Sequence, residues 1–549
     1  MRIFISSLLL VCISACSHLA LEKETEKATE VSYLTVLHTN DNHGRFWHNE
    51  HGEYGMAARK TLIDQLRAQA KAKGHALLLL SGGDINTGVP ESDLQLAEPD
   101  FKGMSEIGYD AMAIGNHEFD NPLEVLDTQQ SWANFPFLSA NIFDKLNNTP
   151  RYQPYSIIKK NNLTIAIIGF TTTDTAKITN PKHVGGLVFK KPEAIAAALL
   201  SEIQQKYQPD ITIAVTHMGH YADAKYGVNA PGDITLARSL PKGALDIVVG
   251  GHSQEPVCMA GENEVDETFS PGKQCRPDHQ NGTWIMQAHE WGKYVGKAEF
   301  KLEGDQLTLL NYALLPVNLY KQGHDGVRLK QLANEYIEPN KVLKELLLPY
   351  QQRGEKQILG NVGFVNGKLE GDRSKVRLQQ VNLASLIISA QMSAVDADFG
   401  IISGGGIRDS IQAGNISYKD VLKVHPFNNL ISYVDLSGQQ ILDYFSVVAK
   451  FPPDSGAYLQ YKNISFDWKN NKTLRVNVNG QPILLNKSYR MSINGYNASG
   501  GDGYPILTAH PDYVATNKTD AEVLKHYIER HTPIDIAEYA VDNTATKTN

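Results

Sequence analysis

The sequence predicts two α/β domains joined by a linker helix. Short runs of aliphatic and β-branched residues end abruptly at small and polar residues, and helical patterns lie between these runs. With 549 residues, of which 42% are hydrophobic and 20% charged, the chain can bury substantial cores. The net charge of −8 and the lack of a Lys/Arg block argue against a nucleic-acid polymer as partner.

The N-terminus has the features of an export signal over residues 1–15. Arg2 precedes a mostly apolar run, and Ser14-Ala15-Cys16 supplies small residues for cleavage. The run is shorter than the roughly 20 residues of a membrane-spanning helix. Residues 13–16 also resemble the bacterial lipobox, in which Cys16 is acylated and becomes the mature N-terminus. The alternative is an ordinary signal that releases a soluble periplasmic protein.

A lipidated Cys16 would place the protein in the cell envelope. Ser17 favours the outer membrane, because the Asp that usually retains Gram-negative lipoproteins in the inner membrane is absent. Residues 16–30 would then form a charged, solvated tether. We expect membrane contact only through this lipid anchor.

Residues 31–338 are predicted to form the first domain, an α/β sandwich. Helical patterns cover residues 55–73 and 193–207. The expected buried strands are residues 33–39, 76–81, 111–114, 163–169, 211–216 and 246–250.

A linker helix and a second α/β domain are predicted to follow. The linker, residues 339–360, contains a helical stretch interrupted by Pro349. The second domain, residues 361–549, opens with a long amphipathic helix near residues 374–393. A strand-like run, residues 397–403, then leads into three glycines.

Two cysteines remain in the folded part of the chain. Cys12 leaves with the signal and Cys16 would be lipidated, so Cys258 and Cys275 are left. In an oxidising compartment they are a natural disulfide pair. A reactive or metal-binding thiol pair is the alternative, but no neighbours at ligand spacing accompany these cysteines.

Polar residues follow several of the predicted strands of the first domain. Ligands bind at the carboxyl ends of strands in open α/β sheets, because loops from several strands converge there. A lone Asp after a strand is usually a helix cap, and a lone His is usually packed or at the surface, but five such loops together favour a site. The candidates are Asp41, His43, Asp84, Asn116, His117, Asp120, His217, His252 and Gln254.

These residue types indicate a pair of divalent metal ions. Imidazoles and carboxylates without thiolates suit Zn, Mn, Fe or Mg, and the candidates are too many for one tetrahedral site. Two ions that share a carboxylate hold the attacking and leaving oxygens of phosphoryl transfer. The sequence therefore predicts a dimetal site for phosphate chemistry.

The same loops carry a family resemblance. Asp41-Asn42-His43, Gly82-Gly83-Asp84, Gly115-Asn116-His117-Glu118, Thr216-His217 and Gly250-Gly251-His252-Ser253-Gln254 match, in order, the motifs of the calcineurin-like metallophosphoesterases. Over residues 33–540 the chain resembles the bacterial periplasmic 5′-nucleotidase/UDP-sugar hydrolase family. The resemblance implies a four-layer α/β/β/α metallophosphoesterase sandwich, then a linker helix and a C-terminal α/β nucleotide-recognition domain.

The resemblance also implies metal ligands and catalytic residues. One ion would be held by Asp41, His43, Asp84 and Gln254, and the other by Asp84, Asn116, His217 and His252, with Asp84 bridging. The ions would be Mg, Mn, Zn or Co. His117 and Asp120 would stabilise the transition state, and a capping Asp beside a structural His is the alternative. Asp174 and His220 also follow strands but occupy no motif position.

The second domain is expected to recognise the nucleotide. Arg373 and Arg377 are four residues apart near a helix start, which alone would fit a solvated basic face equally well. Arg408 follows a glycine-rich turn, where its guanidinium can approach a phosphate. The resemblance places all three arginines in the substrate site.

The nucleoside would be bound by residues in loop-like sequence. Aromatic residues among Gly and Asn favour base stacking over a core position. In the family, two aromatics sandwich the base and an Asp binds the ribose hydroxyls; Tyr496 stands where the family has Phe. The residues concerned are Phe427, Asn429, Tyr496 and Asp502.

We therefore expect an exported dimetal 5′-nucleotidase that acts as a monomer. It would hydrolyse extracellular AMP and related nucleotides, with ADP, ATP and UDP-sugars as further substrates. Substrate would bridge the two domains. The alternatives are a 2′,3′-cyclic nucleotide phosphodiesterase with 3′-nucleotidase activity and a non-catalytic nucleotide-binding lipoprotein.

Overall fold

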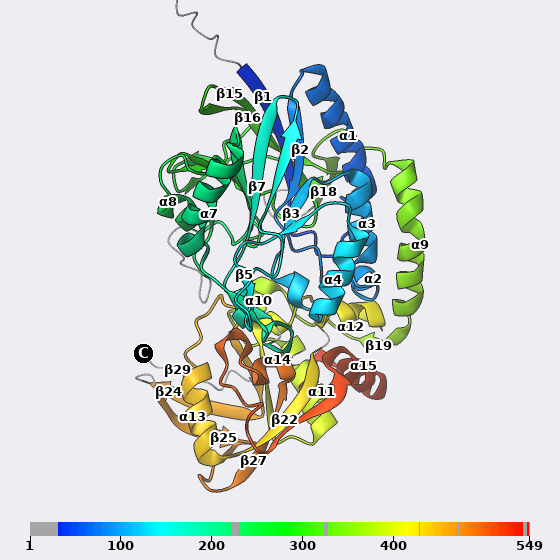
Figure 1. The fold of residues 1–549 in the computed structure, drawn as a ribbon. Helices are drawn as coiled ribbons and strands as arrows, with labels where there is room; N and C mark the ends of the chain where they lie inside the picture. The colour runs from blue at the N-terminus through cyan, green and yellow to red at the C-terminus, as the bar shows by residue number, and fades with distance from the viewer. Residues whose placement is uncertain are drawn as a thin grey trace, which may run out of the picture.

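The computed structural model describes residues 31–541 apart from 180, 222–229, 323–327, 428 and 470–471, together with 546–547. The predicted signal, the tether and Cys16 lie outside the described residues. Figure 1 shows two parts stacked on each other, with the N-terminal half above and the C-terminal half below. None of the described helices is long and apolar enough to cross a membrane.

The N-terminal domain is a four-layer α/β/β/α sandwich, as predicted. Its described residues form two six-stranded sheets, in the orders β16-β15-β1-β2-β3-β4 and β13-β14-β10-β9-β7-β6. The first sheet contains β1 (Val31–Thr39), β2 (Ala76–Ser81), β3 (Ala111–Ala113), β4 (Phe137–Leu138), β15 (Tyr294–Glu303) and β16 (Gln306–Pro316). The second contains β6 (Tyr155–Lys160), β7 (Leu163–Thr171), β9 (Ile211–His217), β10 (Ile247–Val249), β13 (Asp278–Gln280) and β14 (Thr283–Met286).

Alternation along the central strands creates the layers. Leu78 and Leu80 of β2 point into the core between the sheets, whereas Leu79 points into the core beneath the helices. The first sheet is covered by α1 (Met56–Ala72), α3 (Glu98–Ile107) and α4 (Leu123–Trp132), and the second by α7 (Pro192–Tyr207) and α8 (Asp233–Ser239). Shorter elements are α2 (Pro90–Asp93), α5 (Thr175–Ile178), α6 (Pro181–Val184) and the pairs β5 (Ile142–Asp144) with β8 (Leu187–Phe189), β11 (Met259–Gly261) with β12 (Glu264–Val265), and β17 (Tyr320–Gln322) with β18 (Arg328–Leu332).

Parallel pairing brings the ends of several strands to one edge. In the first sheet β1, β2, β3 and β4 run parallel, and in the second β7, β9, β10 and β14 run parallel. Their carboxyl-terminal loops face the C-terminal half of the molecule (Figure 1). This edge is where the predicted site residues follow their strands.

The linker helix α9 (Lys341–Ile358) packs along the N-terminal domain. Asn340 caps it by accepting a hydrogen bond from the Leu343 N–H at 3.0 Å. Leu343 and Leu347 are fully buried in the core beneath α1 and α3. The helix runs through Pro349, so the predicted interruption is wrong; this tertiary packing outweighs the one hydrogen bond that the proline removes.

The C-terminal domain is built on a five-stranded sheet of order β23-β20-β27-β22-β28. Helices α11 and α15 pack on one face, while α13 and the β24–β25 hairpin pack on the other. Its helices are α10 (Arg373–Val376), α11 (Asn382–Val395), α12 (Tyr418–Val424), α13 (Gly438–Val448), α14 (Gly495–Ala498) and α15 (Asp520–His531). Its strands are β19 (Asn361–Val365), β20 (Phe399–Ser403), β21 (Gly414–Ser417), β22 (Leu430–Ser437), β23 (Leu459–Lys462), β24 (Ile464–Lys469), β25 (Lys472–Val478), β26 (Gln481–Pro482), β27 (Ser488–Asn494), β28 (Tyr513–Thr519) and β29 (Thr546–Lys547).

The predicted helix over residues 374–393 is two helices. α10 ends at Val376 and α11 begins only at Asn382. The Gln460 amide donates to the Val376 carbonyl at 2.8 Å and to the Gln379 carbonyl at 2.6 Å, so these groups bond outside a helix. Arg377 is the C-cap residue of α10 and not a residue of a long helix.

The predicted disulfide is present between Cys258 and Cys275, whose Cα atoms lie 5.6 Å apart. It closes a loop between β10 and β13, and the chain-entropy estimate for such a loop is about 3 kcal/mol of stability. An ion pair connects the two domains: Lys419 of α12 pairs with the buried Glu91 of α2.

Candidate metal centre and active site

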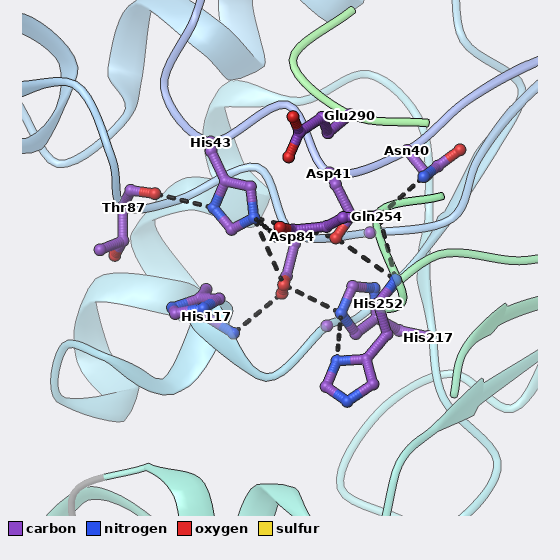
Figure 2. Close-up of polar contacts among 12 residues, drawn as sticks. Asn40, Asp41, His43, Asp84, Thr87, His117, His217, His252, Gln254 and Glu290 are labelled. Atoms are coloured by element: carbon purple, nitrogen blue, oxygen red, sulfur yellow. Dashed lines mark hydrogen bonds and ion pairs between the residues drawn. The ribbon is translucent and has the colours of Figure 1, made fainter. Parts of the chain in front are cut away.

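Most of the predicted metal ligands converge on one point. Asp41 and His43 follow β1, Asp84 follows β2, and His217 is the last residue of β9. Figure 2 shows these side chains, with those of His252 and Gln254 from the loop after β10, directed toward one another around Asp84. Asp41, His43, Asp84 and His217 are buried, whereas His252 and Gln254 are half-buried.

Asp84 lies at the centre of the cluster. Its Oδ2 is 2.9 Å from His217 Nε2 and 3.9 Å from His43 Nε2. His252 Nδ1 lies 3.2 Å from His217 Nε2. Two groups have ligand atoms within 4.8 Å of one another, namely His43 with Asp84 and His117, and Asp84 with His217 and His252. Asp84 belongs to both groups, the position expected of a bridging ligand.

The other predicted ligands lie against this core. Asp41 Oδ1 is 3.8 Å from His43 Nε2, and the Gln254 amide nitrogen is 2.8 Å from the same atom. Asn116 lies next to His117 and lines the cavity above Asp84. Its Oδ1 is buried and has no hydrogen-bond partner among the described residues. An orphaned amide oxygen at this position fits a metal ligand.

Backbone carbonyls orient two of the imidazoles. His43 Nδ1 donates to the Thr87 carbonyl at 2.8 Å, and His217 Nδ1 donates to the Gly82 carbonyl at 2.7 Å. Each bond leaves Nε2 facing Asp84 (Figure 2). This is the arrangement in which a neutral imidazole binds a metal through its second nitrogen.

Five of these residues have left-handed backbone conformations. The φ angles are 50° at Asp41, 49° at His43, 55° at Asp84, 83° at His252 and 58° at Gln254. For residues with a side chain, each such conformation costs of order 1–3 kcal/mol and persists only where the surroundings impose it. Such strain clusters at functional sites, which supports one role for all five residues.

The electrostatics of the cluster favour a cation. Burial raises the pKa of Asp41 to about 7, because its negative charge lacks full compensation. Burial lowers the pKa of His217, but the neighbouring Asp84 charge and hydrogen bond raise it, for a net value of about 10. The same attraction for positive charge would act on a divalent ion, so the donor set fits a metal pair.

His117 and Asp120 form a close pair beside the cluster. His117 Nδ1 is 2.6 Å from Asp120 Oδ2, and the His117 N–H donates to Asp84 Oδ1 at 2.9 Å. Burial lowers the pKa of His117, whereas the charges of Asp120 and Asp84 raise it, for a net value of about 9. The ring is therefore cationic near neutral pH in the metal-free protein.

The two domains enclose a cavity of about 580 Å³ that contains these groups. Arg373, Arg377 and Arg408 line it from the C-terminal side, and Arg373 reaches across to the Gln254 Oε1 at 3.2 Å. Within the described part of the chain these arginines have no carboxylate within 4.0 Å. Burial, and then the charges of Arg373 and Arg408, lower the pKa of Arg377 to about 9. Uncompensated positive charge suits an anionic ligand.

The four predicted nucleoside residues also line the cavity. The Tyr496 hydroxyl donates to Asp502 Oδ1 at 3.0 Å. The Phe427 ring stacks on the His117 ring, with centroids 5.9 Å apart. The guanidinium carbon of Arg408 lies 5.3 Å from the centroid of the Phe427 ring. Asn429 is buried, and its carbonyl accepts the Asp520 N–H at 2.8 Å. The residues predicted to bind metal, phosphate and nucleoside therefore line one cavity.

The two residues outside the motifs have different positions. His220 lines the cavity and its Nε2 lies 2.8 Å from Asp278 Oδ2. Asp174 is buried behind it and accepts the Ala230 N–H.

Sequence reasoning gave no role to four residues that contribute to the site. The Asn40 amide donates to Asp41 Oδ2 at 2.7 Å. His289 and Glu290 follow β14 and line the cavity, and Glu290 lies above Asp41 in Figure 2. Glu118 bonds the backbone of the Asp84 loop. His289 and Glu290 could have been found from the sequence, because they too follow a buried strand that is parallel to its neighbour.

Two family models match the two domains. Residues 34–256 match the calcineurin-like phosphoesterase family, and residues 361–509 match the 5′-nucleotidase C-terminal domain. The chain is 56% identical to a 5′-nucleotidase of Vibrio cholerae, over 94% of this chain and 93% of that one. It is 52% identical to the protein UshA of Escherichia coli, over 97% and 96%.

Solved structures are similar over nearly the whole chain. The crystal structure of a 5′-nucleotidase precursor from Thermus thermophilus superimposes with a TM-score of 0.73 at 26% identity, covering 94% of this chain and 99% of that one. A structure from Staphylococcus aureus at 18% identity, with a TM-score of 0.69, shows the same fold.

Proposed function

Since the chain belongs to the 5′-nucleotidase family, we propose that it hydrolyses 5′-ribonucleotides such as AMP to nucleoside and phosphate. The observation that carries this proposal is one cavity of about 580 Å³ that is lined by the Asp/His cluster, by three arginines and by the proposed base-stacking residues Phe427 and Tyr496. ADP, ATP and UDP-sugars would be further substrates, because each joins a base and a ribose to a phosphate chain that the same side chains could bind.

The metal ligands are proposed as two sets that share Asp84. One set is Asp41, His43, Asp84 and Gln254, and the other is Asp84, Asn116, His217 and His252. When bound, two divalent ions (Mg, Mn, Zn or Co) would supply the Lewis acidity that activates water and neutralises the phosphate. The buried carboxylates and the orphaned Asn116 oxygen support this assignment.

The remaining side chains would bind and polarise the substrate. Arg373, Arg377 and Arg408 supply positive charge for the phosphate oxygens. His117 is held by Asp120 and positioned to donate a proton or a hydrogen bond to the phosphate and the leaving oxygen. This acid–base pair distinguishes an enzyme from a nucleotide-binding protein.

The nucleoside would lie on the C-terminal side of the cavity. Phe427 and Tyr496 offer aromatic faces to the base, Asp502 offers a carboxylate to the ribose, and Asn429 lines the same wall. Because the Phe427 ring stacks on the His117 ring, the proposed binding positions of base and phosphate are adjacent.

A substrate panel tests the proposal. Purified protein is assayed for phosphate release from 5′-AMP, 3′-AMP and UDP-glucose and for hydrolysis of 2′,3′-cyclic AMP, with Mg, Mn, Co or Zn added. We expect 5′-AMP to be the best monophosphate substrate with at least one metal. Preferred cleavage of 2′,3′-cyclic AMP would identify the cyclic phosphodiesterase instead, and no hydrolysis with any metal would identify a binding protein.

The protein is further proposed to be an outer-membrane lipoprotein acylated at Cys16. The lipobox-like residues 13–16 support the anchor, and the Cys258–Cys275 disulfide supports an oxidising compartment. Phase partition in detergent tests it: we expect the wild-type protein in the detergent phase and Cys16→Ser in the aqueous phase. Wild-type protein in the aqueous phase would indicate ordinary signal cleavage.

A further inference from the structure

Glu118 is a buried carboxylate that accepts four backbone N–H groups. The residue lies in a short 3-10 helix, η1 (His117–Phe119), and is 1% exposed. Oε2 accepts the N–H of Gly115 at 2.7 Å and of Asp84 at 3.1 Å. Oε1 accepts the N–H of Ile85 at 2.8 Å and of Asn86 at 3.3 Å. The four donors take the place of water around the carboxylate.

The four donors come from two loops that carry proposed metal ligands. Three of them are consecutive, from Asp84 to Asn86, and converge on one anion as in the concave backbone arrangements that bind phosphates. The fourth donor, Gly115, precedes Asn116 in the loop after β3. Glu118 therefore ties the loop after β2 to the loop after β3.

The same loop also orients a third ligand. His43 Nδ1 lies 2.8 Å from the Thr87 carbonyl and 3.2 Å from the Asn86 carbonyl. The position of the His43 ring thus depends on the loop that Glu118 holds. Asp84 is itself in a left-handed conformation, with φ 55°, which the converging N–H groups help to impose.

From these contacts we infer that Glu118 is a positioning residue of the dimetal site. It prearranges Asp84, Asn116 and His43 before a cation binds, without touching substrate or metal. The inference rests on the proposed metal site and adds a residue that the ligand sets do not contain. Prearranged ligands lower the cost of ordering the site, so loss of Glu118 should weaken metal binding itself.

Glu118→Gln is the variant that tests it. The amide keeps the size of the side chain but turns one acceptor into an NH₂ group that faces N–H donors, so at least two of the four hydrogen bonds are lost. The dissociation constant for Mn²⁺ is measured on the full mature chain by electron paramagnetic resonance, with circular dichroism to confirm folding. We expect Mn²⁺ to bind about 10–100-fold more weakly.

Asp246→Asn is the matched control. Asp246 Oδ2 accepts the Thr212 N–H at 2.8 Å, at the amino-terminal ends of β9 and β10 and so at the opposite edge of the sheet. This variant makes the same carboxylate-to-amide change, but its one amide oxygen can still accept the Thr212 N–H, and we expect wild-type Mn²⁺ affinity. Wild-type affinity in Glu118→Gln, or an equal loss in both variants, would overturn the inference.

Hydrogen exchange on the metal-free wild-type protein decides the question if Glu118→Gln does not fold. We expect the N–H groups of Ile85 and Gly115 to be protected before metal is added, since Glu118 binds them without it. Exchange at the rate of a free loop would overturn the inference. If the wild-type protein bound none of Mg, Mn, Zn and Co, the proposed metal site would fail, whereas protection of these N–H groups would still test whether Glu118 holds the two loops.

Discussion

Chelation of divalent cations is expected to reduce phosphate release from 5′-AMP to the background rate. Without divalent ions the described residues offer no Lewis acid that could activate water, so hydrolysis should stop even though the arginines can still bind the phosphate. Restoring Mg, Mn, Co or Zn should restore the activity, and the metal that restores most identifies the preferred ion. Metal content and rate are measured on the same samples.

The fold should survive this treatment, because the hydrophobic layers and the Cys258–Cys275 disulfide do not depend on metal. Circular dichroism before and after chelation provides the control. Full activity in protein shown to contain no divalent metal would rule out the dimetal assignment.

His117→Ala is expected to lower kcat by about 10²-fold or more while metal content stays unchanged. The ring is the group that Asp120 holds at 2.6 Å and keeps protonated, with a pKa of about 9, so its loss removes a positioned acid. His117 is not in either proposed ligand set, and its hydrogen bond to Asp84 comes from the backbone N–H, which alanine retains. Steady-state kinetics with 5′-AMP and elemental analysis measure the two quantities.

Two further variants serve as controls for His117→Ala. His220 is another half-buried histidine of the cavity paired with a carboxylate, Asp278 at 2.8 Å, but it has no proposed role. His220→Ala should change kcat much less. Arg408→Ala should chiefly raise KM, because Arg408 supplies charge for binding. A larger kcat effect in either control than in His117→Ala would contradict the assigned roles.

The sequence predicted the strands of the sandwich and the residues that follow them. Runs such as residues 76–80 are uninterrupted apolar segments, and the rule that ligands lie after parallel strands needs no side-chain detail. The prediction of one helix over residues 374–393 was wrong, because the apolar spacing continues across the break between the two helices. Gln460, which is far away in sequence, stabilises that break. Such long-range hydrogen bonds leave no periodic signal.

The contacts between residues of the site were harder to predict than which residues lie there. That His117 lies at the site follows from its loop, but that Phe427 stacks on it depends on how the two domains meet. Glu118 was visible in its motif, yet its four donors could be identified only once the loops were packed. Sequence alone therefore gives the candidates, while three-dimensional packing decides which atoms face each other.

The linker helix α9 has a consequence for dissecting the molecule into folding units. Because Leu343 and Leu347 complete the core beneath α1 and α3, a fragment that stopped at residue 338 would leave this apolar surface in water. A fragment that continued through Ile358 would include the helix whose leucines complete this core. The change from one hydrophobic core to the other thus lies near the end of the helix, where Ile358 is already buried among residues of the C-terminal core.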